Sequence, residues 1–293
     1  MASVPVSGIK EETLDTFGSR LARQIEARGP LCVGIDPHPE LLDAWELPDT
    51  PDGLARFCGT VVEALAEQVA VLKPQSAFFE RFGSAGIAVL ESTIRQCRER
   101  GALVLLDVKR GDIGSTANAY AQAYLDPDNP MYSDAVTVSP YPGFAALGPF
   151  LDLAQAHGGG VFVLAATSNA DGRALQRARM ETGKTVAQDI VDQVSAVNEG
   201  ATPFGSVGVV VGVTAGAAGV DLSRLGGPVL APGLGAQGGR AEDLAAVFAD
   251  VRGSVLPSAS REILARGPAV TALKDSAHQV MDECRNALNL ANL

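Results

Sequence analysis

Short, almost entirely apolar runs alternate with longer helical patterns along most of the chain. Helical patterns lie at 53–68, 85–100, 182–199 and 241–250, and another at 11–29 precedes the first apolar run. Continuous apolar runs, unlike runs that alternate with polar residues, are typical of strands covered on both faces in a parallel sheet. The pattern predicts eight such strands, rich in β-branched residues, at 31–35, 69–73, 102–108, 134–138, 161–166, 207–213, 227–231 and 253–256.

Eight strands with intervening helices favour a (β/α)8 barrel, because a doubly wound sheet usually stops at about five or six strands. The chain has 293 residues, and no segment of low complexity divides it. We therefore predict an α/β fold, a single (β/α)8 TIM barrel with an extra N-terminal helix. The predicted domain spans 1–293 and comprises an N-terminal helical extension (1–29), the barrel core (30–265) and a C-terminal helix (266–293).

Composition narrows the class of protein. With 46% hydrophobic and 19% charged residues, the chain can build a sizeable core. The formal net charge of −11 argues against a nucleic-acid binder or a basic membrane-surface protein, since both need faces rich in Lys and Arg. It would also argue against an anionic substrate, although net charge does not describe an individual pocket.

Cysteine usage and hydropathy predict a soluble, cytoplasmic protein. The four cysteines show no CxxC spacing, so neither a zinc site nor a disulfide framework is expected. Residues 1–10 lack the pattern of a signal peptide. The most apolar long segment, 207–220, is shorter than the roughly 20 residues that span a bilayer. His38, His157 and His278 have no ligand-like spacing and are expected at the surface or in packing.

In a barrel, the active site lies at the C-terminal ends of the strands. The third predicted strand ends with Asp107 and Lys109, which are two residues apart and therefore point to the same face of an extended strand. Asp112 follows beyond the strand, and Lys73 ends the neighbouring strand. Adjacent strands lie about 4.8 Å apart, so Lys73 can approach Asp107.

This Lys–Asp–Lys–Asp array has two interpretations. It could be a structural network of ion pairs. However, its place at the barrel mouth, with two lysines and two aspartates, favours chemistry, because buried charges are costly unless they are paired. A lysine held charged by carboxylates is a competent proton donor.

A second polar group follows the seventh and eighth strands. Gly233, Gly235 and Gly238 spell GxGxxG, but the segment comes too late in the chain for a dinucleotide fingerprint and lacks the acid expected after it. A phosphate site is the better interpretation, in which the glycines let backbone N–H groups approach the anion. Gln237 would add an amide donor, and Arg261 would grip phosphate oxygens. Alternatively, the glycines form only a tight turn and Arg261 pairs with Glu262 or another carboxylate.

Six segments fall in order at the predicted strand ends: GIDP (34–37), LKPQSAFFE (72–80), DVKRGDIGST (107–116), TVSPYPG (137–143), APGLGAQGG (231–239) and LPSASREIL (256–264). Together they resemble the longer bacterial branch of the orotidine 5′-monophosphate decarboxylase family. The resemblance covers about residues 30–265, and its most specific element is Asp-x-Lys-x-x-Asp, which related barrels acting on sugar phosphates partly share.

The resemblance implies conversion of orotidine monophosphate (OMP) to uridine monophosphate (UMP) and carbon dioxide, without metal, pyridoxal or thiamine. It implies Lys109 as proton donor, Asp107 against the substrate carboxylate, and Lys73 holding Asp107. It also implies a homodimer whose Asp112, Ile113 and Thr116 enter the neighbouring site. The substrate contacts it implies are Asp36 and Thr116 for the ribose, Ser139 for the pyrimidine, and Gln237, Gly238 and Arg261 for the phosphate.

Three of these residues could instead have simple local roles. Asp36 before Pro37 could start a turn, Ser139 could be an ordinary loop residue, and Thr116 could cap a helix. Two rival functions also remain. The first is a metal-dependent phosphosugar enzyme such as a 3-keto-hexulose phosphate synthase or decarboxylase. The second is a non-catalytic barrel that binds UMP without consuming OMP.

Overall fold

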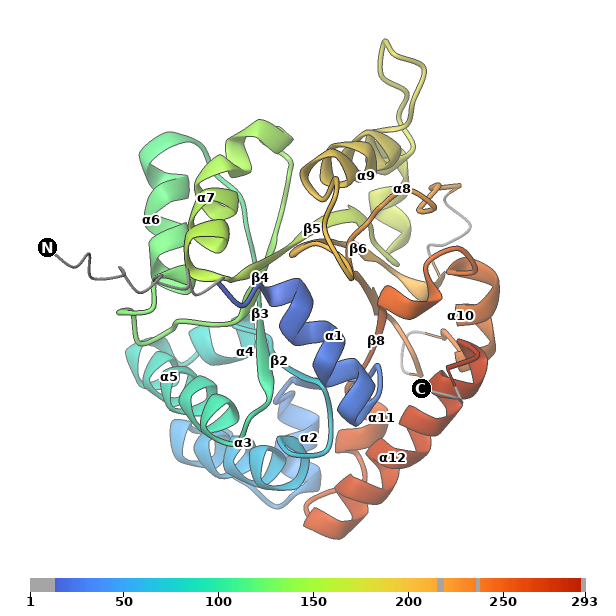
Figure 1. Ribbon diagram of the computed structural model, residues 1–293. Coiled ribbons are helices and arrows are strands. Elements are labelled where there is room, and N and C mark those ends of the chain that lie inside the picture. Colours follow the sequence, from blue (N-terminus) through green and yellow to red (C-terminus); the bar gives the residue numbers. More distant parts are fainter. Residues whose placement is uncertain (1–13, 215–218, 236–237, 291–293) are drawn as a thin grey trace, which may run out of the picture.

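Eight parallel strands close into a barrel in the computed structural model, which describes residues 14–214, 219–235 and 238–290 (Figure 1). The strands follow chain order around the barrel, and β8 pairs with β1. All eight predicted strands are confirmed. Their bounds are β1 Cys32–Ile35, β2 Val71–Pro74, β3 Leu103–Arg110, β4 Ala135–Val138, β5 Gly160–Ala166, β6 Val207–Val211, β7 Val229–Pro232 and β8 Val255–Ala259.

Helices surround the barrel on its outside (Figure 1). The α-helices are α1 Phe17–Arg28, α2 Pro39–Ala44, α3 Pro51–Leu65, α4 Ala77–Glu80, α5 Gly83–Glu99, α6 Gly114–Leu125, α7 Gly148–His157, α8 Arg173–Gln176, α9 Val186–Val197, α10 Ala241–Val247, α11 Arg261–Leu264 and α12 Val270–Ala287. Short 3-10 turns lie at Phe144–Leu147, Ala170–Gly172 and Arg252–Ser254. No helix in the described ranges is long and apolar enough to cross a membrane.

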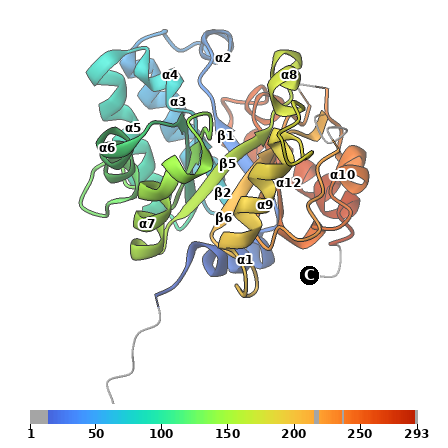
Figure 2. The ribbon, with the colours of Figure 1, turned by 90° about the horizontal axis from the view of Figure 1, so that it is seen from above.

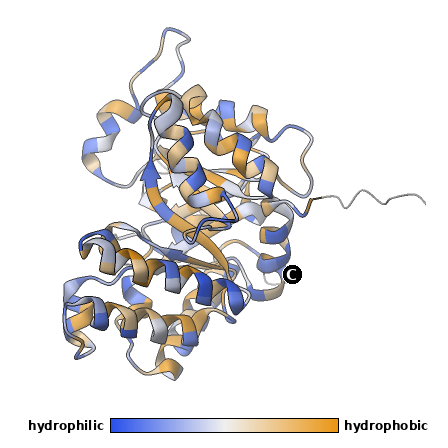
Figure 3. Cartoon of the chain, turned by 90° about the vertical axis from the view of Figure 1, so that its left-hand side faces the viewer, coloured by the Kyte–Doolittle hydropathy of each residue, from blue (hydrophilic) through white to orange (hydrophobic). Residues whose placement is uncertain are grey.

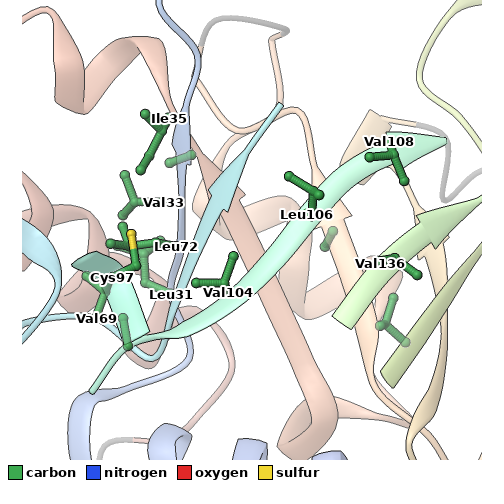
Figure 4. Packing of buried hydrophobic residues seen from close by; sticks show 14 of the residues in the cluster. Leu31, Val33, Ile35, Val69, Leu72, Cys97, Val104, Leu106, Val108 and Val136 are labelled. Atoms are coloured by element: carbon green, nitrogen blue, oxygen red, sulfur yellow. The ribbon is translucent and has the colours of Figure 1, made fainter. Parts of the chain in front are cut away.

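The main core lies between the strands and the outer helices. Alternate strand residues contribute to it, including Val104, Leu106 and Val108 of β3, since successive side chains on a strand point to opposite faces (Figure 4). Hydrophilic and hydrophobic residues alternate along the helices (Figure 3), and the long helices such as α3 and α5 bury their apolar sides. Each strand is therefore covered on its outer face, as its continuous apolar run predicts.

A second core fills the barrel interior at the N-terminal ends of the strands. Phe17, Leu21 and Ile25 of α1 pack against the inward residues there, and the Phe17 ring meets that of Phe162 edge-on, with centroids 5.9 Å apart. The end where α1 packs is opposite the end where α2 and α8 lie (Figure 2). The extra N-terminal helix is thus confirmed, and it closes one end of the barrel. It begins at Phe17, where the Thr16 hydroxyl caps it by accepting from the Ser19 N–H.

One irregularity in the sheet affects the site directly. The pairing of β3 with β4 runs through Leu106↔Val136 and resumes at Arg110↔Val138. Three residues of β3 therefore stand opposite one residue of β4, which is a β-bulge. The bulge ends at Lys109, whose φ of 47° lies in the left-handed region.

The predicted boundaries near residues 30 and 265 fall just before β1 and just after α11. The organisation of 1–293 as a single domain stays a prediction.

Candidate active site

A cavity of about 370 Å³ lies at the C-terminal ends of the strands, the end of the barrel away from α1. Its volume is in the range of small-molecule sites, about 300–1,000 Å³. Its polar and charged lining comes from β1–β5, β8 and the segments that follow them: Asp36, His38, Lys73, Gln75, Asp107, Lys109, Thr137, Thr167, Ser168, Ser258, Ser260 and Arg261. Its apolar lining comes mainly from β5, β6, β7 and α4: Phe78, Leu164, Val210, Leu230, Pro232, Gly233, Leu234 and Ala259.

Asp107 is the centre of the polar half of this cavity. Its two carboxylate oxygens each lie 2.7 Å from the Lys109 Nζ, and one of them lies 3.2 Å from the Lys73 Nζ. The other accepts a hydrogen bond from the Thr137 hydroxyl at 2.7 Å. A buried carboxylate is therefore held by two ammonium groups and one hydroxyl.

These contacts keep the two buried side chains, Asp107 and Lys73, in their charged forms. Burial alone would raise the pKa of Asp107, but the charges of Lys73 and Lys109 outweigh it and hold that pKa well below its usual range. Burial alone would likewise lower the pKa of Lys73, but Asp36 and Asp107 leave it above its usual value. Asp107 and Lys73 are therefore both charged at neutral pH.

Asp36 lies at the edge of this array and retains unused hydrogen-bonding capacity. Its Oδ1 is 4.0 Å from the Lys73 Nζ, and this buried oxygen accepts no hydrogen bond from the described residues. The buried Ser260 hydroxyl has no such partner either. A Cβ atom at Gly34 would lie 2.8 Å from Asp36 Oδ2 and 2.9 Å from Ser260 Cβ, so the glycine allows both residues to approach. Buried polar groups are normally paired, so these two atoms are suited to a ligand.

The bulge in β3 explains how Lys109 reaches Asp107. The two-residue spacing predicts a meeting on a regular strand, whereas the structure brings the side chains together through a bulge with Lys109 in the left-handed region. The Lys109 N–H donates to the Thr137 hydroxyl at 3.0 Å. Sequence reasoning missed Thr137, although its two-residue spacing from Ser139 on the fourth strand, toward the same face, could have signalled it.

Part of the predicted phosphate site is present in the structure. Arg261 begins α11, lines the cavity and forms no ion pair within the described residues, so the predicted alternative of pairing with Glu262 is not observed. Gly233 also lines the cavity. Gln237 lies outside the described residues.

The glycine segment differs from the expectation that its N–H groups are open to an anion. The N–H groups of Gly235, Gly238 and Gly239 donate to carbonyls of the same loop. Gly238 does not line the cavity. The loop satisfies these donors itself because its positive-φ glycines let it fold back tightly.

Four further predicted residues, besides Gly238, lie outside the cavity of their own chain. Asp112 accepts from the Ile113 N–H, and Ile113 is 64% exposed. Thr116 is exposed on the first turn of α6, and the Ser139 N–H donates to the Arg110 carbonyl. All four follow β3 or β4, so the structure places them together on the rim.

The long segment at 167–183 begins at the cavity and leaves it. Thr167 and Ser168 line the cavity, whereas Asn169 accepts from the Thr167 hydroxyl and does not. His38, expected only in packing or at the surface, packs against Phe78 with ring centroids 4.3 Å apart, and both line the cavity. The described ranges contain no group of three or more His, Cys, Asp or Glu side chains placed to hold a metal ion.

Comparison with known proteins extends the family resemblance over the whole barrel. The model of the "Orotidine 5'-phosphate decarboxylase / HUMPS family" matches residues 29–276. An orotidine 5′-phosphate decarboxylase of Salinispora tropica is 62% identical over 275 residues, which cover 94% of this chain and 99% of the relative. Another, of Streptomyces coelicolor, is 52% identical over 279 residues, with the same coverage of both chains.

Solved structures agree with this likeness. A crystal structure of a Streptomyces avermitilis protein assigned as an orotidine 5′-phosphate decarboxylase superposes with a TM-score of 0.92 at 51% identity, covering 97% of this chain and 100% of that one. The OMP decarboxylase of Leishmania donovani superposes with a TM-score of 0.73 at 28% identity, covering 94% and 100%.

Proposed function

The chain belongs to the orotidine 5′-phosphate decarboxylase family, and on that premise we propose that it converts OMP to UMP and carbon dioxide in pyrimidine biosynthesis. It is a carboxy-lyase. The single observation that carries the proposal is the Lys73–Asp107–Lys109 cluster at the floor of a cavity of ligand size, in a chain 62% identical to a named decarboxylase over nearly its full length.

The proposed chemistry begins with cleavage of the bond between ring carbon 6 and the carboxylate. Carbon dioxide leaves and the electron pair stays on carbon 6, where no neighbouring carbonyl delocalises it well. The Lys109 ammonium stabilises this negative charge and then transfers a proton to carbon 6. Lys109 regains its proton from water. Its side chain is suited to this task because it is 47% exposed and lines the cavity, whereas that of Asp107 is 8% exposed.

Asp107 has two parts in this proposal. It holds the Lys109 ammonium in place, and it lies where the substrate carboxylate would approach. Repulsion between two carboxylates disfavours the bound substrate and disappears as carbon dioxide leaves. Lys73 keeps Asp107 ionised and contacts the ribose.

The rest of the nucleotide would be bound by the remaining cavity residues. Asp36, whose Oδ1 accepts no hydrogen bond from the described residues, is suited to a ribose hydroxyl, and Arg261 is suited to the phosphate. Gln237 and Gly238 would close over the phosphate, and Ser139 would recognise the pyrimidine. Binding of the phosphate supplies energy that is used at the reacting ring.

We further propose a homodimer in which Asp112, Ile113 and Thr116 complete the partner's site. The support is that these residues lie outside their own cavity, with Ile113 64% exposed. A polar residue that reaches a partner's site need not line its own.

We propose that the reaction requires no metal or organic cofactor, and a cytoplasmic location is supported by four buried, free cysteines. The test is to follow loss of the orotate chromophore on incubation with OMP, with and without a metal chelator. Turnover that resists the chelator supports the proposal. Activity lost with chelator and restored by magnesium would favour the metal-dependent phosphosugar enzyme, and UMP binding without turnover would favour the non-catalytic barrel.

A further inference from the structure

We propose that Thr137 is a positioning residue for this reaction: its hydroxyl fixes both the carboxylate of Asp107 and the backbone of Lys109. This inference rests on the proposed function and deepens it. Thr137 is 1% exposed and has its side chain on the inner face of β4, beside the charged cluster.

The hydroxyl joins two groups that the fold would otherwise leave loosely held. It donates to Asp107 Oδ1 at 2.7 Å and accepts from the Lys109 N–H at 3.0 Å. A hydroxyl has one proton to donate and lone pairs to accept with, so both bonds form at once. Thr137 therefore links the acidic and the basic member of the pair through a single atom.

The bulge creates the need for this link. Thr137 is the residue of β4 that stands opposite the three bulged residues 107–109 of β3. At a bulge the ladder of backbone hydrogen bonds is interrupted. The Lys109 N–H thus turns to the Thr137 side chain, and regular pairing resumes where the Ser139 N–H donates to the Arg110 carbonyl at 2.8 Å.

The backbone conformation of Lys109 makes this bond more important. A φ of 47° is unfavourable for a residue with a side chain, and such conformations persist only when the surroundings hold them. The bond from the Lys109 N–H to Thr137 is one such restraint. It fixes the point from which the lysine side chain departs.

The other bond fixes the rotation of the carboxylate. Lys109 contacts both oxygens of Asp107, and Lys73 contacts only Oδ2. Without Thr137, Oδ1 keeps a partner only in Lys109, and the carboxylate can rotate about its last bond. Rotation would move the Lys109 ammonium away from the position where carbon 6 must receive its proton.

The test compares Thr137→Val, which keeps the shape but removes the hydroxyl, with Thr137→Ser, which keeps the hydroxyl. Thr93→Val is the matched control, because Thr93 is also buried, at 2% exposed, and its hydroxyl donates to a carbonyl within α5. We expect Thr137→Val to lower kcat about 10- to 100-fold, as the loss of a hydrogen bond to a charged group implies. We expect KM and UMP affinity to stay within about threefold, and Thr137→Ser to restore most of kcat.

A merely structural role predicts a different pattern. Loss of stability without loss of kcat, or an equal loss in Thr93→Val, would overturn the proposal. If Thr137→Val does not fold, the smaller Thr137→Ala is expected to show the same loss of kcat at retained UMP affinity, and unchanged kcat there would also overturn it.

A second measurement is independent of turnover. Amide hydrogen exchange at Lys109 should be faster in Thr137→Val than in wild type or Thr137→Ser, because its acceptor is gone. Unchanged exchange would overturn the proposal even in a chain that does not consume OMP. Conversely, a wild-type chain without turnover contradicts the proposed function alone.

Discussion

The Lys109 ammonium lies 2.7 Å from both carboxylate oxygens of Asp107, and the two side chains are placed at different depths. The Asp107 side chain is 8% exposed, whereas the Lys109 side chain is 47% exposed. The buried Asp107 carboxylate therefore holds in place the Lys109 ammonium, which faces the cavity. Under the proposed function, this arrangement makes Lys109 rather than Asp107 the residue that transfers a proton to the ligand.

Replacing Lys109 with alanine should abolish turnover and keep nucleotide binding. We expect kcat to fall by at least about 10⁴-fold, because both the proton donor and the charge that stabilises the carbanion are lost. UMP affinity, measured by calorimetry, should change little. Lys184→Ala is the matched control, since Lys184 pairs with Asp192 at the surface, away from the cavity. Near wild-type turnover in Lys109→Ala would refute the assignment.

Replacing Asp107 with asparagine should destabilise the fold at neutral pH by about 3–5 kcal/mol, because it leaves the buried Lys73 without its nearest counter-charge. The contribution of Asp107 is present above its ordinary pKa near 4 and is lost as the pH falls through its lower folded value. The raised pKa of Lys73 keeps that partner charged up to at least about pH 10.

The difference in unfolding free energy between wild type and Asp107→Asn should therefore be constant from about pH 5 to 9 and shrink below about pH 4. Urea denaturation across this range measures it. Asp192→Asn, in the exposed pair with Lys184, should have little effect at any pH. Equal stability of Asp107→Asn and wild type at pH 7 would contradict the prediction.

Replacing Arg261 with alanine should weaken recognition of the phosphate specifically. We expect kcat/KM for OMP to fall about 10²–10³-fold, because a guanidinium bound to phosphate oxygens is lost. Inhibition by UMP should weaken strongly, whereas inhibition by uridine, which has no phosphate, should not change. Arg240→Ala is the control, since Arg240 is exposed beside Glu242 outside this cavity. An equal effect on UMP and uridine would place the phosphate elsewhere.

A shared site predicts complementation between two inactive variants. Asp112→Ala and Lys109→Ala homodimers should both be inactive. A heterodimer, purified with two different affinity tags, should recover about half of wild-type activity, because one of its two sites receives both native residues. If Asp112 acted within its own chain, no site in the heterodimer would be complete, and no activity would return.

Replacing Phe17 with alanine should separate stability from catalysis. Phe17 is fully buried, and its ring packs against Phe162 at the end of the barrel opposite the cavity. We expect a loss of about 3–5 kcal/mol in unfolding free energy with kcat unchanged below the melting temperature. Leu14→Ala, at a position 52% exposed, should alter neither quantity appreciably. A fall in kcat for Phe17→Ala would show that the two ends of the barrel are coupled.

Hydropathy alone was enough to predict the eight strands and the extra helix, because burial on both faces leaves continuous apolar runs. The place of Lys73 beside Asp107 followed from strand spacing. The Asp107–Lys109 contact was also predicted, but from a regular strand, whereas the structure makes it through a bulge. The bulge could not be predicted, because it depends on how β3 and β4 align in space. The spacing of Thr137 from Ser139 could have placed its side chain on the inner face, but its two bonds could not be predicted, since they exist only opposite the bulge.

The rim residues and the glycine loop show a second limit of the sequence. The resemblance implied a site that includes Asp112, Ile113 and Thr116, yet a single chain places them outside its own cavity. A local pattern likewise suggested free N–H groups at Gly235 and Gly238, but these donors are satisfied within the loop. Which donors stay open depends on tertiary folding rather than on residue type.

The helix α1 leaves the barrel open at one end only. Phe17, Leu21 and Ile25 seal the floor beneath the strands, so nothing the size of a nucleotide can pass through the barrel from end to end. Substrate, carbon dioxide and UMP must all use the mouth at the C-terminal ends of the strands. If the chain acts as proposed, UMP bound at this mouth blocks the entry of the next OMP, so we expect UMP to inhibit the reaction competitively.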